Sequence, residues 1–89
     1  MEEKKVAIVT GASRGIGRAT AVELARAGFY VVVNYNASEA AAAETLAQVE
    51  AAGSAGEIRK FDVADAAAVK EALAAVVAEH KRIDVLVNN

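Results

Sequence analysis

The stretch that decides the fold is Val6-Ala7-Ile8-Val9-Thr10-Gly11-Ala12-Ser13-Arg14-Gly15-Ile16-Gly17, an apolar run that leads into a glycine-rich segment. Gly11 lets the chain turn sharply where a strand ends, Gly15 removes a side chain where phosphate groups would approach, and Gly17 lets a helix pack closely. A helix N-terminus also offers unpaired N–H groups and a partial positive charge. We therefore predict a strand, a phosphate-binding turn and a helix, in this order.

The glycine spacing separates kinds of nucleotide-binding loop. It reads G-x-x-x-G-x-G, which differs from G-x-G-x-x-G, and no Gly-Lys-Ser or Gly-Lys-Thr ending follows it. A P-loop NTPase is therefore disfavoured. The glycines could also serve only a tight turn between a strand and a helix, so the motif needs a βαβ context before it indicates a ligand.

Short β-branched runs alternate with alanine-rich stretches of helical length along the chain. We expect strands at residues 6–10, 30–33, 57–61 and 83–87, separated by three helices and without any hairpin dipeptide. This pattern predicts successive βαβ crossovers. The expected fold is an α/β, Rossmann-like parallel sheet, partial, with strand order 3-2-1-4, the first two helices on one face and the third on the other.

Local signals mark the helix limits. The first helix is expected to run from residue 14 or 15 to residue 27 and to end at Gly28. Ser38 is predicted to cap the second helix, which ends at Gly53, and Asp65 to cap the third. The apolar residues of the third helix that share one predicted face are Val69, Leu73, Val76 and Val77.

Composition limits the classes of function. The 89 residues carry 10 Lys and Arg, 12 Asp and Glu and no cysteine, so we expect one domain over residues 1–89, without disulfides or thiolate catalysis. The net charge of -2 gives no electrostatic reason to expect a nucleic-acid or acidic-membrane partner. Residues 1–5 lead into a short apolar run that resembles neither a signal peptide nor a membrane span, which indicates a cytoplasmic protein.

Three motifs, in order and at family-like spacing, resemble those of the short-chain dehydrogenase/reductase family. Residues 10–17 look like its nucleotide-binding loop, Asp62-Val63 like its adenine-contacting Asp-Val pair, and Asn88-Asn89 like the opening of its Asn-Asn-Ala-Gly motif. The resemblance covers the whole chain and implies an NADPH-dependent reductase that transfers hydride between a carbonyl and an alcohol. Within the family, residues 31–35 and 83–89 look most like beta-ketoacyl-acyl-carrier-protein reductases of fatty acid biosynthesis.

The residues after the second strand bear on the choice of cofactor. NAD-binding members of the family place an acid there, which binds the ribose 2'-hydroxyl, whereas this chain has Asn34, Tyr35 and Asn36. Arg14 matches the family position whose guanidinium pairs with a 2'-phosphate, although a solvated loop arginine is the alternative. NADP(H) is therefore favoured over NAD(H). Glu39 is the nearest acid that could favour NAD(H) instead. Its presence is also explained by its position in the first turn of a helix, where an acidic side chain is favourable.

The resemblance assigns the site residue by residue. Asp62 would accept a hydrogen bond from the adenine amino group, or would be only a loop aspartate near a helix start. Ala64 stands where the family often has a Ser or Thr cap, so capping is expected to fall to Asp65. The predicted cofactor-binding residues are Gly11, Ser13, Arg14, Gly15, Ile16, Gly17, Asn34, Tyr35, Asn36, Asp62, Val63 and Asn89.

No catalytic or metal-binding residue is assigned. Carbonyl reduction in the family rests on Ser, Tyr and Lys with the spacing Tyr-x-x-x-Lys, and neither Tyr30 nor Tyr35 is followed by such a lysine. His80 is interpreted as a surface residue without a ligand partner. We interpret the chain as the cofactor-binding portion of a reductase, inactive by itself. A stand-alone or engineered half-Rossmann module that binds a dinucleotide, or that only self-assembles, is the alternative.

The predicted fourth strand would form an apolar edge of the sheet. An unpaired edge of this kind invites pairing with another chain. We therefore expect self-association, either through the edge at Val85–Val87 or through the face of the third helix, which the predicted topology leaves half covered.

Overall fold

The computed structural model describes residues 4–89, so the first three residues of the segment 1–5 lie outside the described residues. Strands and helices alternate as predicted, and strand limits differ from the expected ones by one or two residues. The elements are β1 (Val6–Val9), α1 (Gly15–Arg26), β2 (Tyr30–Tyr35), α2 (Glu39–Ala51), β3 (Gly56–Lys60), α3 (Ala66–His80) and β4 (Val85–Val87).

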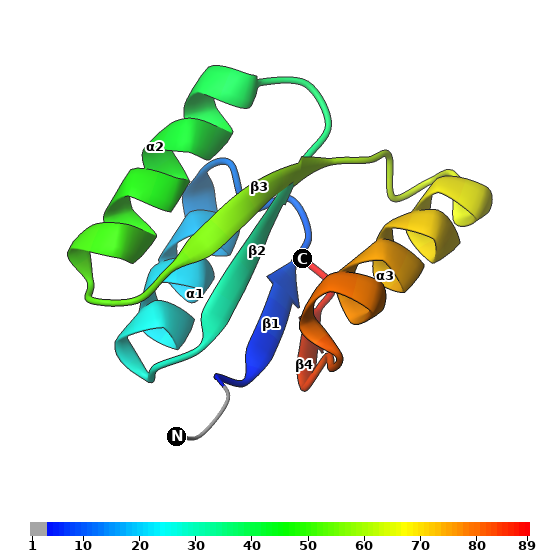
Figure 1. Cartoon of the computed structure of the whole chain (residues 1–89). Coiled ribbons are helices and arrows are strands. Elements are labelled where there is room, and N and C mark those ends of the chain that lie inside the picture. Colours follow the sequence, from blue (N-terminus) through cyan, green and yellow to red (C-terminus); the bar gives the residue numbers. More distant parts are fainter. Residues whose placement is uncertain (1–3) are drawn as a thin grey trace.

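The four strands form one parallel sheet with the order β3-β2-β1-β4 (Figure 1), which confirms the predicted topology. In the register of the sheet, Val9 at the end of β1 pairs with Val33 on one side and with Val87 on the other. Parallel strands end at the same edge of a sheet. The segments that follow β1, β2 and β4 therefore meet at one edge, where the glycine-rich turn begins.

Helices cover both faces of the sheet, with α1 and α2 on one face and α3 on the other (Figure 1). Alternate strand residues point to opposite faces. Accordingly, one buried cluster contains Val9, Val31 and Val33 with residues of α1 and α2, while Ile8 and Val32 join Val76 of α3 in a second cluster.

Helix α3 is buried less than its sequence pattern predicts. Val76 is its one buried residue within the described part of the chain, and Leu73 is partly buried beside it. Val77 was expected on the same face, but its exposed fraction is 46%. A step of one residue turns about 100° around a helix. Because α3 contacts the sheet along a narrow line through Val76, this step carries Val77 out of the contact, and its assignment to the buried face was wrong.

The predicted caps are confirmed, and the helix ends agree with the predicted ones to within one or two residues, with α1 ending at Arg26 and α2 at Ala51. The Ser38 hydroxyl accepts a hydrogen bond from the Ala41 N–H (3.1 Å), and the Asp65 carboxylate accepts one from the Ala68 N–H (3.1 Å). Gly28 and Gly53 follow the ends of α1 and α2 with φ of 94° and 99°. None of the helices in the described part of the chain combines the length and hydrophobicity that crossing a bilayer requires.

A polar network joins β2, β3 and α3 near the amino ends of the strands, at the opposite end of the sheet from the glycine turn. The Tyr30 hydroxyl donates to Glu57 (2.9 Å), the His80 Nε2 atom lies 3.1 Å from the same carboxylate, and the Tyr30 and His80 rings lie 4.4 Å apart. His80 is therefore not a solitary surface residue, as the sequence predicted, because its ring is partly buried against residues of β2 and β3. The absence of a metal role for it stays a prediction. Arg59 bonds both Glu57 and Glu79, so the cluster is an ion-pair network.

Hydrogen bonds determine the charge state of Glu57 in this network. Burial opposes its ionisation, but hydrogen bonds with His80, Arg59 and Tyr30 outweigh that effect and hold the pKa of Glu57 below its usual value. Burial, together with the Glu57 carboxylate, raises the pKa of Tyr30. At neutral pH, therefore, an ionised carboxylate and a neutral tyrosine hold β2 against β3.

Asp84 joins the beginnings of β1 and β4. Its Oδ2 atom accepts a hydrogen bond from the Val6 N–H (2.8 Å), and the Arg82 guanidinium bonds both carboxylate oxygens at 2.7 Å. The bonds from Arg82 and from the Val6 N–H hold the pKa of Asp84 below its usual value.

We predict that the depth of burial, and not the residue type, determines how much each α3 valine stabilises the fold. Val76→Ala leaves a cavity under the helix and is expected to lower the free energy of unfolding by about 2 kcal/mol. Val77→Ala is the matched control and is expected to change it by less than about 0.5 kcal/mol. Urea unfolding monitored by circular dichroism measures both. Equal losses would show that α3 does not dock through Val76.

A second prediction concerns acid stability. Because the pKa of Asp84 is lower in the folded chain than in the unfolded one, its stabilisation is complete above the unfolded value of about 3.9 and is lost as the pH falls through the folded value. Asp84→Asn should therefore reduce the slope of unfolding free energy against pH below about pH 4. Glu50→Gln, which removes an exposed carboxylate of α2, is the control, and an unchanged slope in Asp84→Asn contradicts the prediction.

Candidate functional site

The glycine-rich turn begins directly after β1 and is bonded to the end of β2. The Gly11 N–H donates to the Asn34 side-chain oxygen (3.0 Å), and the Ala12 N–H donates to the Asn34 backbone oxygen (2.9 Å). The first N–H groups of the turn are thus satisfied within the protein. The remaining N–H groups of the turn and of the first turn of α1 form the surface that a ligand could use.

Asn34 lies beneath this turn and not beside it. It belongs to β2, is 2% exposed, and donates through its side-chain nitrogen to the Phe61 carbonyl (3.0 Å). The strand was expected to end at residue 33, but it runs two residues further because Asn34 and Tyr35 continue the pairing with β3. Asn34 therefore holds the turn in place, and its contact with a cofactor stays a prediction.

Two glycines fit the predicted roles in different ways. Gly15 has a φ of +62°, which side chains rarely adopt, and a Cβ atom built on it would meet nothing within 4 Å. The space above Gly15 is therefore open to a ligand. A Cβ atom on Gly17 would lie 2.3 Å from the Gly11 carbonyl oxygen, so this glycine allows α1 to begin directly against the turn.

Helix α1 begins differently from the other two helices. Ser38 and Asp65 cap α2 and α3 with side-chain oxygens, whereas Arg14 precedes α1 and provides no such bond. The first N–H groups of a helix have no partner within it. With the helix dipole, they make a positive surface next to the open space at Gly15, which suits an anion. Ile16 lies in this first turn and is 78% exposed.

The Arg14 side chain is exposed and forms no hydrogen bond or ion pair within residues 4–89. Asn36, directly after β2, is also exposed, whereas Tyr35 is only 7% exposed and packs in the core. The Tyr35 hydroxyl lies 3.4 Å from the Glu39 carboxylate. Burial is the larger cause that raises the pKa of Tyr35, and the negative charge of Glu39 adds to it. Glu39 thus already accepts a hydrogen bond from the protein.

Asn89 borders the turn from the side of β4. Its backbone N–H donates to the Thr10 hydroxyl (2.9 Å), and its side-chain nitrogen donates to the Gly11 carbonyl (3.0 Å). The Thr10 hydroxyl in turn donates to the Val87 carbonyl (3.2 Å). The segments after β1 and β4, whose predicted site residues are 78 positions apart, therefore lie in direct contact.

Asp62 and Val63 follow β3 at the same edge of the sheet. Both are exposed, and the Asp62 carboxylate accepts a hydrogen bond from the Ala64 N–H (2.9 Å). Phe61, immediately before them, donates its N–H to the Tyr35 carbonyl (3.1 Å) and accepts from Asn34. The Asp-Val pair is thus linked to the glycine turn through Asn34.

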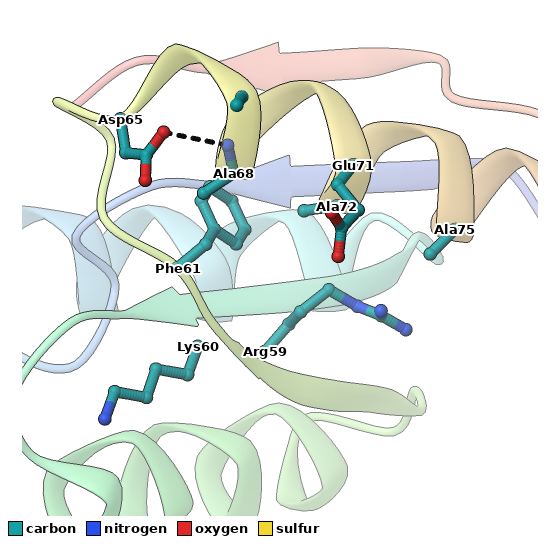
Figure 2. A pocket seen from close by; sticks show the side chains of 9 residues that line it. Arg59, Lys60, Phe61, Asp65, Ala68, Glu71, Ala72 and Ala75 are labelled. Atoms are coloured by element: carbon teal, nitrogen blue, oxygen red, sulfur yellow. Dashed lines mark hydrogen bonds between the residues drawn. The ribbon is translucent and has the colours of Figure 1, made fainter.

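A cleft of about 380 Å³ lies between β3 and α3 (Figure 2). The Phe61 ring and the Arg59 side chain lie between the strand and the helix, and Asp65, which caps α3, stands at one end. The cleft begins next to Asp62 and Val63 but includes no residue of the glycine turn. We assign the candidate site to the turn, because its N–H groups and open space suit a ligand, whereas the cleft follows from the shallow contact of α3.

Two residues that hold the turn in place were not predicted from sequence. Arg18 donates to the Ser13 carbonyl (2.6 Å) and to the Thr45 hydroxyl (2.8 Å), and Thr45 donates to the Ala12 carbonyl (2.8 Å). Ser13, a predicted site residue, is thereby fixed from α1 and α2. The separation of 27 residues between Arg18 and Thr45 leaves no local signal of this contact.

Comparisons with known proteins identify the family of the chain. The chain matches the short chain dehydrogenase family over residues 5–89. It is 40% identical to the short-chain dehydrogenase/reductase homolog YusS of Bacillus subtilis, covering 96% of this chain and 78% of that protein. It is 47% identical to a 3-oxoacyl-acyl-carrier-protein reductase of Synechocystis, covering 96% of this chain but only 34% of the reductase.

Solved structures have the same fold. Acetoin dehydrogenase of Enterobacter cloacae matches 100% of the chain with a TM-score of 0.89 at 38% identity, over 35% of its own length. A dehydrogenase of Burkholderia cenocepacia, whose structure holds bound NADP, matches 97% of the chain with a TM-score of 0.87 at 34% identity, over 34% of its length. Because the family match spans the sheet, the glycine turn and the residues around it, this chain belongs to the short-chain dehydrogenase family.

Proposed function

We propose that this chain is the cofactor-binding portion of an NADPH-dependent short-chain reductase. The observation that carries the proposal is the uncapped N-terminus of α1 under the open space at Gly15, with the exposed Arg14 next to it. Backbone N–H groups and the helix dipole would bind the pyrophosphate of the dinucleotide. The match to about a third of the length of the Synechocystis reductase supports the interpretation as a portion of a larger enzyme.

The preference for NADP(H) over NAD(H) is proposed from charge. Arg14 has no internal partner among residues 4–89 and can form a charge-assisted pair with a 2'-phosphate. No acid lies at the end of β2 or at the exposed Asn36 that follows it, and Glu39 is bonded to Tyr35. The bound NADP of the Burkholderia cenocepacia relative supports this preference.

The other predicted residues would hold the rest of the cofactor. Asp62 and Val63, exposed after β3, would contact the adenine, and Asn89 would border the cofactor from the side of β4. The bound cofactor would supply a hydride for reduction of a carbonyl group. Similarity to 3-oxoacyl-acyl-carrier-protein reductases favours a 3-oxoacyl thioester as the substrate class of the complete enzyme. The cytoplasm as its compartment stays a prediction from sequence.

We predict that Arg14→Ala removes the preference for NADPH. The substitution deletes the cation that would pair with the 2'-phosphate, so NADPH binding should weaken about tenfold or more, whereas NADH binding should change little. Calorimetric titration of the chain with each cofactor measures both affinities. Arg26→Ala, which removes an exposed arginine at the other end of α1, is the control.

Two outcomes would count against the proposal. An unchanged ratio of NADPH to NADH affinity in Arg14→Ala would refute the role of this arginine. The absence of saturable binding of either cofactor to the unmodified chain would instead favour the alternative of a half-fold that only self-assembles.

We also propose that copies of the chain associate through the β4 edge or through α3. Within the described residues β4 pairs only with β1, and Leu86 is 45% exposed, while Val77 of α3 is 46% exposed. Edge strands and exposed apolar groups are common sites of association.

The two surfaces can be told apart by charged substitutions. Leu86→Lys should weaken association about tenfold if copies meet at the strand edge, whereas Val77→Lys should do so if they meet at α3. Sedimentation velocity over a range of concentrations measures the association. The proposal is contradicted if the unmodified chain stays monomeric at every concentration. It is also contradicted if both variants associate as strongly as the unmodified chain.

A further inference from the structure

A polar latch connects the glycine turn to helices α1 and α2, and it consists of Arg18 and Thr45. Arg18 is partly buried and donates to the Ser13 carbonyl (2.6 Å), the Ala41 carbonyl (2.9 Å) and the Thr45 hydroxyl (2.8 Å). Thr45 is fully buried and donates to the Ala12 carbonyl (2.8 Å). Two successive carbonyl groups of the turn are thus bonded on the same side, toward α2.

This latch determines where two N–H groups of the turn point. A peptide unit is planar and trans, so its C=O and the N–H of the next residue point in opposite directions. Fixing the Ala12 carbonyl toward α2 therefore directs the Ser13 N–H away from α2, and fixing the Ser13 carbonyl does the same for the Arg14 N–H. An anion needs N–H groups toward it and carbonyl oxygens away from it. The latch supplies both conditions.

The same bonds fix the backbone from which the Arg14 side chain extends. The Arg14 guanidinium forms no hydrogen bond or ion pair among residues 4–89, so the latch acts on it through its backbone. We propose that Arg18, with Thr45, is a positioning residue for recognition of the 2'-phosphate of the cofactor. This inference rests on the proposed function, because it assumes that the turn binds NADPH.

The test compares affinity ratios, which a general loss of stability does not change. Arg18→Ala should lower the ratio of NADPH to NADH affinity about tenfold, toward the ratio of Arg14→Ala. In the double variant Arg14→Ala/Arg18→Ala the ratio should fall no further, because the group that Arg18 positions is already gone. Thr45→Val keeps the shape of the side chain, removes its hydroxyl and should lower the ratio in the same direction.

The control variant is Arg26→Ala, which lies on the same helix but outside the latch. It should keep the ratio of NADPH to NADH affinity of the unmodified chain. If Arg18→Ala does not fold, Thr45→Val and its combination with Arg14→Ala provide the test. An unchanged ratio in the folded latch variants would overturn the positioning role while leaving NADPH binding intact. A lack of NADPH binding by the unmodified chain would overturn both the latch and the proposed function.

Discussion

The side-chain amide of Asn34 joins the ends of three neighbouring strands. Its oxygen accepts from the Gly11 N–H after β1, and its nitrogen donates to the Phe61 carbonyl after β3, while Asn34 itself lies in β2. A buried amide is costly unless its groups are bonded. The turn can therefore keep its shape only where the three strand ends stand in this register, and the candidate site depends on the sheet through this residue.

The amino ends and the carboxyl ends of the strands have different roles. At the amino ends, charged pairs around Glu57 and Asp84 are bonded within the protein and stabilise the strand order. At the carboxyl ends, the N-terminus of α1 and Arg14 are left without internal partners in the described part of the chain. Open α/β sheets bind ligands at the carboxyl ends of their strands. The division of bonded and unbonded polar groups here agrees with that rule.

The sequence predicted those features that depend on neighbouring residues. The strand order follows from alternating apolar runs and the handedness of crossovers, and the caps at Ser38 and Asp65 follow from residue types at helix starts. Features that depend on distant residues were missed or misplaced. The partner of His80 lies 23 positions away in β3, and Arg18 meets Thr45 across two elements, so no local pattern marks either contact. Val77 fits the helical period, but the period does not specify how broad the contact of α3 with the sheet is.

If the proposed function is right, anionic groups of NADPH bind at the glycine turn and the first turn of α1. The most direct measurement is the change of backbone amide chemical shifts when NADPH is added to the labelled chain. We expect saturable changes that are largest at residues 13–17, with little change at Glu57 and His80 on the opposite edge. Changes that are absent, or that are largest around Arg59 and Glu71 in the cleft between β3 and α3, would contradict the claim.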